Sequence, residues 1–208
     1  MTRISRIPPG RAGRLWLRRR IGTAERGRDQ LERKLRILVP ELQRRRIKAE
    51  RHRADWAAAR RDADTWLLRA VLLGGQDAVR NASAPRPVTV LLHVETSMGL
   101  SYPVDATLSP PVQSPYLPGS TAVVHAGEAH RTALLAGVRT AAAEEAVRRV
   151  ETETVTTRRR LRGLEKRWLP ELQQALAALE LSLEQAEQED NMRLRTGVTS
   201  STDRRRAP

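Results

Sequence analysis

The sequence predicts a mainly α-helical protein: a long antiparallel two-helix coiled coil, made of N- and C-terminal arms, with a small central β-hairpin and loop insert. The two arms, residues 11–73 and 125–195, are of similar length and lack the dense Pro and Gly of the middle. Residues 74–124 carry most of the prolines and the only strand-like alternation. Two helical arms joined by an insert fold back on each other, so we expect a rod rather than a globule.

The N-terminal arm is expected to form one helix after a short tail, residues 1–10. Pro8-Pro9-Gly10 is a stiff, non-helical entry after which a helix can start. Apolar residues then recur at steps of three and four if Arg45 and His52 fill two positions: Leu31, Leu35, Leu38, Leu42, Ala49, Trp56, Ala59, Ala63, Trp66, Ala70 and Leu73. This heptad pattern predicts one apolar seam along the helix, and Gly74-Gly75 is expected to end it.

The insert is expected to contain a β-hairpin followed by a loop. Apolar residues alternate with others from Val88 to Leu92, Ser97-Met98-Gly99 can turn, and residues 102–108 can form a second strand. Residues 109–119 hold four prolines and are expected to form a loop. The residues expected to shape the hairpin are Val88, Val90, Met98, Gly99 and Tyr102.

The C-terminal arm has apolar spacing that averages about 3.6 residues from Leu161 onward, which predicts weak supercoiling. Residues 196–208 are polar and are expected to be a disordered tail. Pro40 and Pro170 lie inside the arms, and each arm either breaks or bends there. The seam continues in phase through Pro40, which favours a bend.

Composition excludes several functions. The chain has no cysteine, so disulfides, thiolate zinc sites and Cys nucleophiles are excluded. No run of 18 apolar residues appears, and the four histidines do not have metal-ligand spacing. No phosphate-binding loop or catalytic arrangement is found, so we expect no catalytic residues, no cofactor and no metal.

The net charge is +14, and it is unevenly placed. Residues 1–53 carry 18 Lys and Arg against five acids, whereas residues 171–190 carry six acids and no base. An antiparallel register that sets residue 73 near residue 130 would place this acidic segment against residues 14–33. It would also place Arg44, Arg45 and Arg46 beside Arg158, Arg159 and Arg160. Such an arginine cluster is either solvated or a contact for carboxylates of a partner.

Three motifs in order carry a family resemblance. The first is Ala24-x-x-Gly27-x-x-x-Leu31-x-x-Lys34 after Ile7-Pro8-Pro9, and the second is Met98-Gly99-Leu100-Ser101-Tyr102-Pro103. The third is Thr157-Arg158-Arg159-Arg160-Leu161-Arg162-Gly163-Leu164-Glu165, followed by Pro170 and Glu187-Gln188-Glu189. Over nearly its whole length the chain resembles the D subunit of the V-type (vacuolar/archaeal-type) rotary ATPases, the central rotor shaft.

The resemblance implies a non-catalytic shaft of a bacterial V/A-type proton- or sodium-translocating ATPase or ATP synthase. Its expected partners are the hexamer of catalytic and nucleotide-binding subunits (A and B), the small stalk subunit (F) and the funnel-like subunit on the membrane ring. The expected location is cytoplasmic and peripheral to the cell membrane, with no direct nucleic acid contact. Position and charge put the expected hexamer contact, near the open end, on Arg11, Arg14, Trp16, Arg18, Arg19, Met192, Arg193 and Arg195, with the arginine cluster as a second contact.

The positive charge also permits a different class of function. A basic coiled-coil protein could bind nucleic acid or an anionic membrane surface, and a high-GC genome that favours Arg over Lys would explain part of the charge. Strongly salt-dependent binding of the isolated chain to DNA or to anionic vesicles would favour the basic coiled-coil protein. An enzyme is the weakest hypothesis, because no side-chain arrangement supports one.

Overall fold

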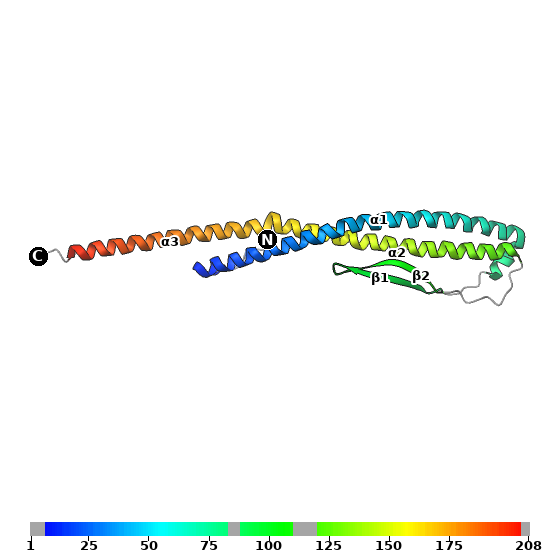
Figure 1. Cartoon of the computed structure of the whole chain (residues 1–208), viewed down its shortest axis with the longest axis horizontal. Coiled ribbons are helices and arrows are strands. Elements are labelled where there is room, and N and C mark those ends of the chain that lie inside the picture. The colour runs from blue at the N-terminus through cyan, green and yellow to red at the C-terminus, as the bar shows by residue number, and fades with distance from the viewer. Residues whose placement is uncertain (1–6, 83–87, 110–119, 205–208) are drawn as a thin grey trace. The chain divides into compact units, whose positions relative to one another are not determined.

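The computed structural model describes residues 7–82, 88–109 and 120–204, with side chains as far as Leu194. The elements are helix α1 (Gly10–Ala82), strands β1 (Val90–Ser97) and β2 (Leu100–Leu108), helix α2 (Thr121–Gly163), the π-helical turn η1 (Leu164–Trp168) and helix α3 (Leu169–Arg204) (Figure 1). This order confirms the predicted fold class, since long helices flank a two-stranded antiparallel hairpin. None of these helices has an apolar stretch long enough to span a bilayer.

The chain divides into two units. The terminal unit comprises Met1–Arg33 and Thr157–Pro208, and the central unit comprises Lys34–Thr156. The boundaries of the helices differ from those expected. Helix α1 was expected to end at Gly74, but it continues to Ala82 across Gly75, whose φ of 77° and ψ of 164° are not helical. Ala78 and Val79 pack against the cluster around Ala70, which explains why helix resumes after the glycine pair.

The other helix ends also lie outside the expected arm. The sequence places the start of the C-terminal helix near Thr121 or later, and α2 begins at Thr121, four residues before the arm of residues 125–195. Ser120 caps it: its Oγ accepts a hydrogen bond from the N–H of Ala122 at 3.2 Å. Helix α3 continues to Arg204, although the sequence predicted that helix ends near Arg195 and that a disordered tail follows.

The two internal prolines are accommodated differently. Helix α1 continues through Pro40, as the phase of the seam predicted. Pro170 lies just after η1, where the N–H of Leu169 bonds to the carbonyl of Leu164, five residues earlier. A proline ring clashes with the carbonyl four residues before it. A wider π turn relieves that clash, so the helix passes Pro170 without breaking.

The terminal unit is held together by large apolar side chains. Leu17 and Ala24 of α1 are buried against Leu169 and Leu172 of α3. Partly buried side chains surround them: Ile7, Trp16, Ile21, Leu164, Trp168, Ala175, Leu176 and Leu179. Gly13 allows the chain to pass close by, because a Cβ atom there would overlap the carbonyl oxygen of Pro8.

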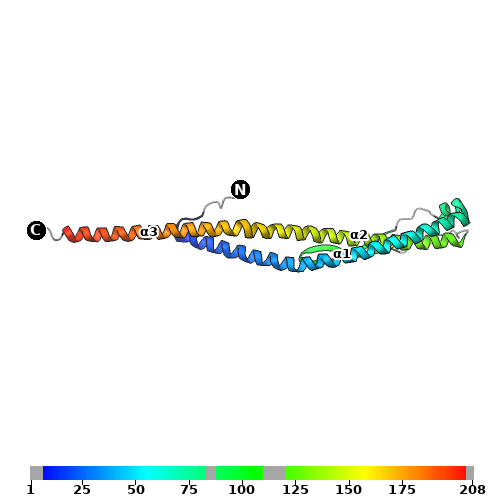
Figure 2. The same ribbon diagram turned by 90° about the horizontal axis from the view of Figure 1, so that it is seen from above.

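The central unit is held together mainly by small side chains. The buried alanines are Ala49, Ala63, Ala70, Ala106, Ala122, Ala126, Ala129, Ala142, Ala143 and Ala146. The central part of α1 runs beside α2 in both views (Figures 1 and 2), and the Thr140 hydroxyl donates to the carbonyl of His52 at 2.9 Å. The hairpin packs on these helices, with buried Tyr102 against Leu38, Ala146 and Val150.

The hairpin has the predicted turn. Ser97 pairs with Leu100, and Met98 (φ 51°) and Gly99 (φ 76°) form a two-residue loop with both φ values positive. Such a loop matches the twist of the flanking strands. A bulge between His93 and Val94 interrupts the pairing, next to Pro103.

The register of the helices differs from the expected one by about two helical turns. In the central unit Arg46 pairs with Glu151 at 2.6 Å rather than lying opposite residue 158. In the terminal unit Arg18 pairs with Glu180 at 2.8 Å rather than lying opposite residue 186. The prediction that the acidic segment of α3 faces the basic segment of α1 is confirmed. The exact register depends on the position at which the two helical arms turn back on each other.

Candidate functional site

A groove of about 490 Å³ lies in the terminal unit between α1 and η1. Its lining residues are Trp16, Arg19, Arg20, Thr23, Ala24, Gly27, Leu164 and Trp168. Two indoles, two guanidinium groups and a small-residue floor are typical of a surface that binds a protein segment rather than a small polar substrate.

Helix periodicity explains how α1 supplies its wall. Trp16, Arg20, Thr23 and Gly27 follow one another at steps of four, three and four, so they lie on one face of α1. Ala24 and Gly27 have little or no side chain, which leaves the floor of the groove low. The two tryptophans line the groove and are partly buried.

The opposite wall depends on the π turn. Leu164 and Trp168 are the first and last residues of η1. An additional residue in the turn rotates side chains relative to an ordinary α-helix. Because the turn precedes Pro170, this proline has an indirect effect on the groove.

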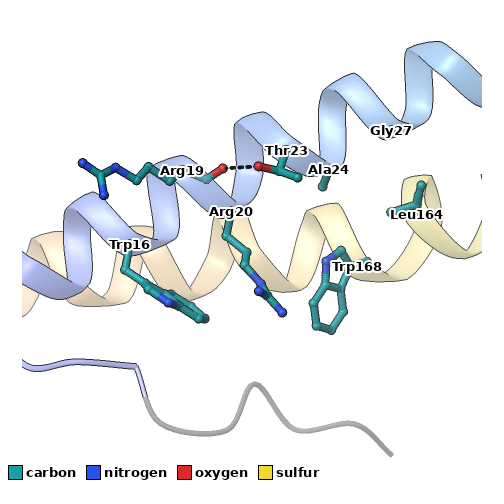
Figure 3. Close-up of a pocket in the computed structure, with 8 residues that line it drawn as sticks. All are labelled: Trp16, Arg19, Arg20, Thr23, Ala24, Gly27, Leu164 and Trp168. Atoms are coloured by element: carbon teal, nitrogen blue, oxygen red, sulfur yellow. Dashed lines mark hydrogen bonds between the residues drawn. The ribbon is translucent and has the colours of Figure 1, made fainter.

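The arginines of the groove are not neutralised by the described part of the chain. The guanidinium carbon of Arg20 lies 5.3 Å from the ring centroid of Trp16, a cation–π contact. Figure 3 shows Arg20 between the two indoles, whereas Arg19 points away and its carbonyl accepts a hydrogen bond from Thr23 at 2.9 Å. No described residue forms an ion pair with Arg19 or Arg20. The groove is thus a cationic, aromatic surface.

Two of the residues predicted at the open end link α1 to α3. Arg11 pairs with Glu187 at 3.1 Å, and Arg18 pairs with Glu180 at 2.8 Å, so both arginines tie α1 to α3. Arg14 is half-buried, and its Nε has no hydrogen-bond partner among the described residues. These exposed ion pairs are each worth only about 0.2–1 kcal/mol, and they orient the helices more than they stabilise them.

The remaining open-end residues lie on α3. Met192 and Arg193 line a second hollow together with Gln185, Gln188, Glu189 and Asn191. The side chain of Arg195 is outside those that the structure describes. Of the predicted open-end residues, only Trp16 and Arg19 contribute to the groove.

Arg45 of the predicted arginine cluster is bound within the protein. Its Nη2 lies 2.6 Å from Glu41 and 3.4 Å from Glu95, and its guanidinium covers the Tyr102 ring at 4.7 Å. Burial is the largest single influence on Arg45 and lowers its pKa, but the hydrogen bond and negative charge of Glu41, together with Tyr102, outweigh burial, so the pKa is raised. Arg45 therefore holds the hairpin against α1 as a permanent cation.

The other arginines of the cluster are exposed. Arg44 lies 3.5 Å from Glu41, and Arg46 pairs with Glu151. Arg158, Arg159 and Arg160 are exposed on α2 in the terminal unit, and no described residue forms an ion pair with them. As contacts for a partner they stay a prediction.

The hairpin residues have two different environments. Tyr102 is buried, whereas Val88, Val90 and Met98 are 37%, 42% and 43% exposed. Several side chains of β2 are buried, whereas the side chains of β1 are exposed or half-buried.

Arg20, Trp168 and Leu164 were not among the contact residues predicted from the sequence. The signal was present in the i, i+4 spacing of Trp16 and Arg20 and in a tryptophan two residues before a proline. No group of three or more potential metal-ligating side chains occurs among the described residues.

The family model for the ATP synthase D subunit matches residues 15–196, which include both helical stretches and the hairpin. No curated protein sequence matches the chain significantly.

Proposed function

We propose, from the premise that the chain belongs to the ATP synthase D subunit family, that it is the central rotor shaft of a bacterial V/A-type ATPase or ATP synthase. Membership of this family makes the chain a stalk subunit of a rotary ATPase, which associates with other subunits of that complex. The proposal is that this stalk turns and so couples ATP hydrolysis or synthesis to proton or sodium transport. The match over residues 15–196 is the observation that carries the proposal.

The packing of each unit supports a mechanical role. A shaft must transmit torque without unwinding, and paired helices with buried contacts resist twisting better than a single helix. Leu17 and Leu172 are fully buried in the terminal unit, and Ala70 and Val150 are fully buried in the central unit. Ion pairs such as Arg53–Glu144, at 2.7 Å, link the helices on the outside.

The proposed partners follow from the family. The terminal unit would enter the hexamer of catalytic and nucleotide-binding subunits, with its groove and its exposed Arg158–Arg160 as contacts. The central unit would join the small stalk subunit and the funnel-like subunit on the membrane ring. The chain itself would carry no active site and would reach the membrane only through the complex, on its cytoplasmic side.

Reversible cross-linking in the assembled complex tests the rotation. The chain has no cysteine, so Arg193→Cys provides one unique, exposed attachment point on α3. A benzophenone attached there through a disulfide would be irradiated to link the chain to its neighbour. A turning shaft predicts that ATP hydrolysis falls in proportion to the linked fraction and recovers when reductant cleaves the disulfide.

The controls separate the alternatives. Labelled complex that is not irradiated should hydrolyse ATP at the normal rate. Full hydrolysis in a fully linked complex would show that the chain is static. If the chain fails to join a rotary ATPase complex and instead binds DNA or anionic vesicles with steep salt dependence, the alternative of a basic nucleic acid- or membrane-binding protein replaces the proposal.

A further inference from the structure

Strand β1 is unusually exposed for an apolar strand. All of its side chains from Val90 to Thr96 are exposed, on both faces of the strand. Leu91, Leu92 and Val94 are 56%, 56% and 58% exposed. The described sheet has only two strands, so one long edge of β1 has no partner strand. Proteins rarely leave an apolar edge strand in this state unless something covers it.

The opposite edge of the hairpin is covered. Lys48 Nζ donates to the carbonyl of Val104 at 2.6 Å, and Arg149 Nη1 donates to the carbonyl of Ser101 at 3.1 Å. These side chains come from α1 and α2, so they attach β2 to both helices. Tyr102 and Ala106 of β2 are buried at 2% and 0% exposure. The helices therefore hold β2 and leave β1 as the outer strand.

The pairing of the hairpin determines which backbone groups of β1 are free. A two-residue loop makes Ser97 and Leu100 a hydrogen-bonded pair, and such pairs alternate along an antiparallel ladder. At the other end, the N–H of Ser109 donates to the carbonyl of Thr89 at 2.9 Å. Both ends of the hairpin therefore indicate the same alternation of bonded and non-bonded pairs. The odd-numbered residues of β1 bond to β2, and the N–H and C=O groups of Val90, Leu92, Val94 and Thr96 point outward.

Nothing in the described part of the chain protects this outward row. No described side chain donates to or accepts from the backbone of β1 between Val90 and Thr96. The strand also lacks the lysine, arginine or proline residues that commonly block edge-to-edge pairing. The extra residue of the bulge belongs to β2. The alternation of inward and outward backbone groups along β1 is therefore uninterrupted.

We propose that β1 accepts a third β-strand, supplied as an extended segment by a neighbouring subunit of the ATPase complex. The identity of that neighbour as a rotary ATPase subunit rests on the proposed function. Outward donors and acceptors recur along β1 every second residue, about 6.8 Å apart, and another strand has the matching repeat. A helix has already satisfied its own backbone groups and cannot bond to this row.

The surface beside β1 gives the added strand apolar neighbours. Val90, Leu92 and Val94 share one face of the strand, with Leu91 on the other. A hollow of about 260 Å³ at the base of the hairpin lies between Val88, Leu108, Leu134 and Leu135. It can receive an apolar side chain at one end of the incoming segment. We therefore expect a segment with alternating apolar residues.

Hydrogen exchange at single-residue resolution tests the proposal, using the isolated chain and the assembled complex. Assembly should slow exchange of the amides of Val90, Leu92, Val94 and Thr96 by about tenfold or more, because each gains a hydrogen bond. The amides of Leu91, His93 and Glu95 are bonded to β2 in both states and should change much less. This alternating pattern is specific to strand addition.

Two variants at one position separate backbone pairing from side-chain docking. Leu92→Pro removes an outward N–H and leaves the ladder to β2 intact, whereas Leu92→Ala shortens the same side chain and keeps the N–H. Each variant would compete with the wild-type chain for complex depleted of it, after thermal unfolding has shown that both fold. The proposal predicts that Leu92→Pro competes about tenfold less well than Leu92→Ala.

Three other outcomes would overturn the proposal, and a fourth bears on the proposed function. Equal weakening by the two variants would indicate docking through side chains. Protection already present in the isolated chain would indicate that a second copy covers β1 if dilution removes it, and that the chain's own segment covers β1 if dilution does not. Normal assembly with no protection would leave β1 uncovered while the proposed function stands. Failure of the wild-type chain to join the complex would count against the proposed function instead.

Discussion

The terminal unit is closed by leucine and tryptophan, whereas the central unit is closed mainly by alanine. Leu17, Leu172 and Leu169 fill the first interface, with Trp16 and Trp168 at its side. In the second, buried alanines such as Ala63, Ala70 and Ala146 lie between α1 and α2. The separation of packed helices depends on the size of the side chains between them.

This difference in side-chain size accompanies a difference in the surface hollows of the two units. Large side chains in the terminal unit leave the groove lined by two indoles and by arginines without described carboxylate partners. The hollow above Ala49 in the central unit is instead lined by Arg46, Arg53, Glu144 and Glu151, which pair with one another across the helices. The terminal unit thus leaves a cationic, aromatic groove at its surface, whereas ion pairs across the helices close the corresponding hollow of the central unit.

Removing a large side chain from the terminal unit should have the largest effect. Leu172→Ala deletes a side chain that is 0% exposed, and we expect a loss of about 2–5 kcal/mol in the free energy of unfolding. Urea unfolding followed by circular dichroism measures this loss. Leu181→Ala, at a position 57% exposed on the same helix, should change stability by less than about 0.5 kcal/mol. Equal losses would contradict the packing described for this unit.

Enlarging a small side chain should damage the central unit. Ala146 is 1% exposed beside Leu38, Tyr102 and Val150, so Ala146→Leu has no space and should cost about 1–3 kcal/mol. Exposed Ala141 on the same helix provides the matched control, and Ala141→Leu should be nearly neutral. Thermal unfolding compares the two. If Ala146→Leu proved as stable as the wild-type chain, the alanine interface would be loosely packed.

Much of the fold could be predicted because its signals are local. The heptad pattern predicted the helix through Pro40, and Met98-Gly99 predicted the turn of the hairpin. The end of α1 could not be predicted from Gly74-Gly75, because Ala78 and Val79 gain packing with the start of α2. The register was wrong by about two turns for the same reason: where the helices close is decided by tertiary contacts.

The site was less predictable than the fold. Positive charge drew attention to arginines, but charge alone does not distinguish Arg18, which pairs with Glu180, from Arg20, which stacks on Trp16. Arg18 and Arg20 differ in the face of α1 that they occupy, and this difference matters only once α3 packs against α1. Arg45 could likewise be recognised as a clamp for the hairpin only after Glu41 and Tyr102 were brought beside it.

The smallest expected effect concerns how firmly the central unit holds its hairpin. Glu145 receives hydrogen bonds from Arg149 Nε and Arg148 Nη2, both at 2.7 Å, and these bonds lower the pKa of Glu145. Arg149 also donates to the carbonyl of Ser101, so Glu145 orients a side chain that caps β2.

Because the folded-state pKa of Glu145 is lowered, its ion pairs contribute fully above the unfolded carboxyl pKa of about 4.3 and are lost as the pH falls through the folded value. Glu145→Gln should therefore unfold at slightly lower urea than the wild-type chain at pH 7, and the difference should vanish in acid. Exchange of the β2 amides should be faster in the variant at pH 7. Glu184→Gln on α3, where no described residue forms an ion pair, should alter neither measurement. A difference between Glu145→Gln and wild type that persisted unchanged into acid would show that the carboxylate charge has no part in holding the hairpin.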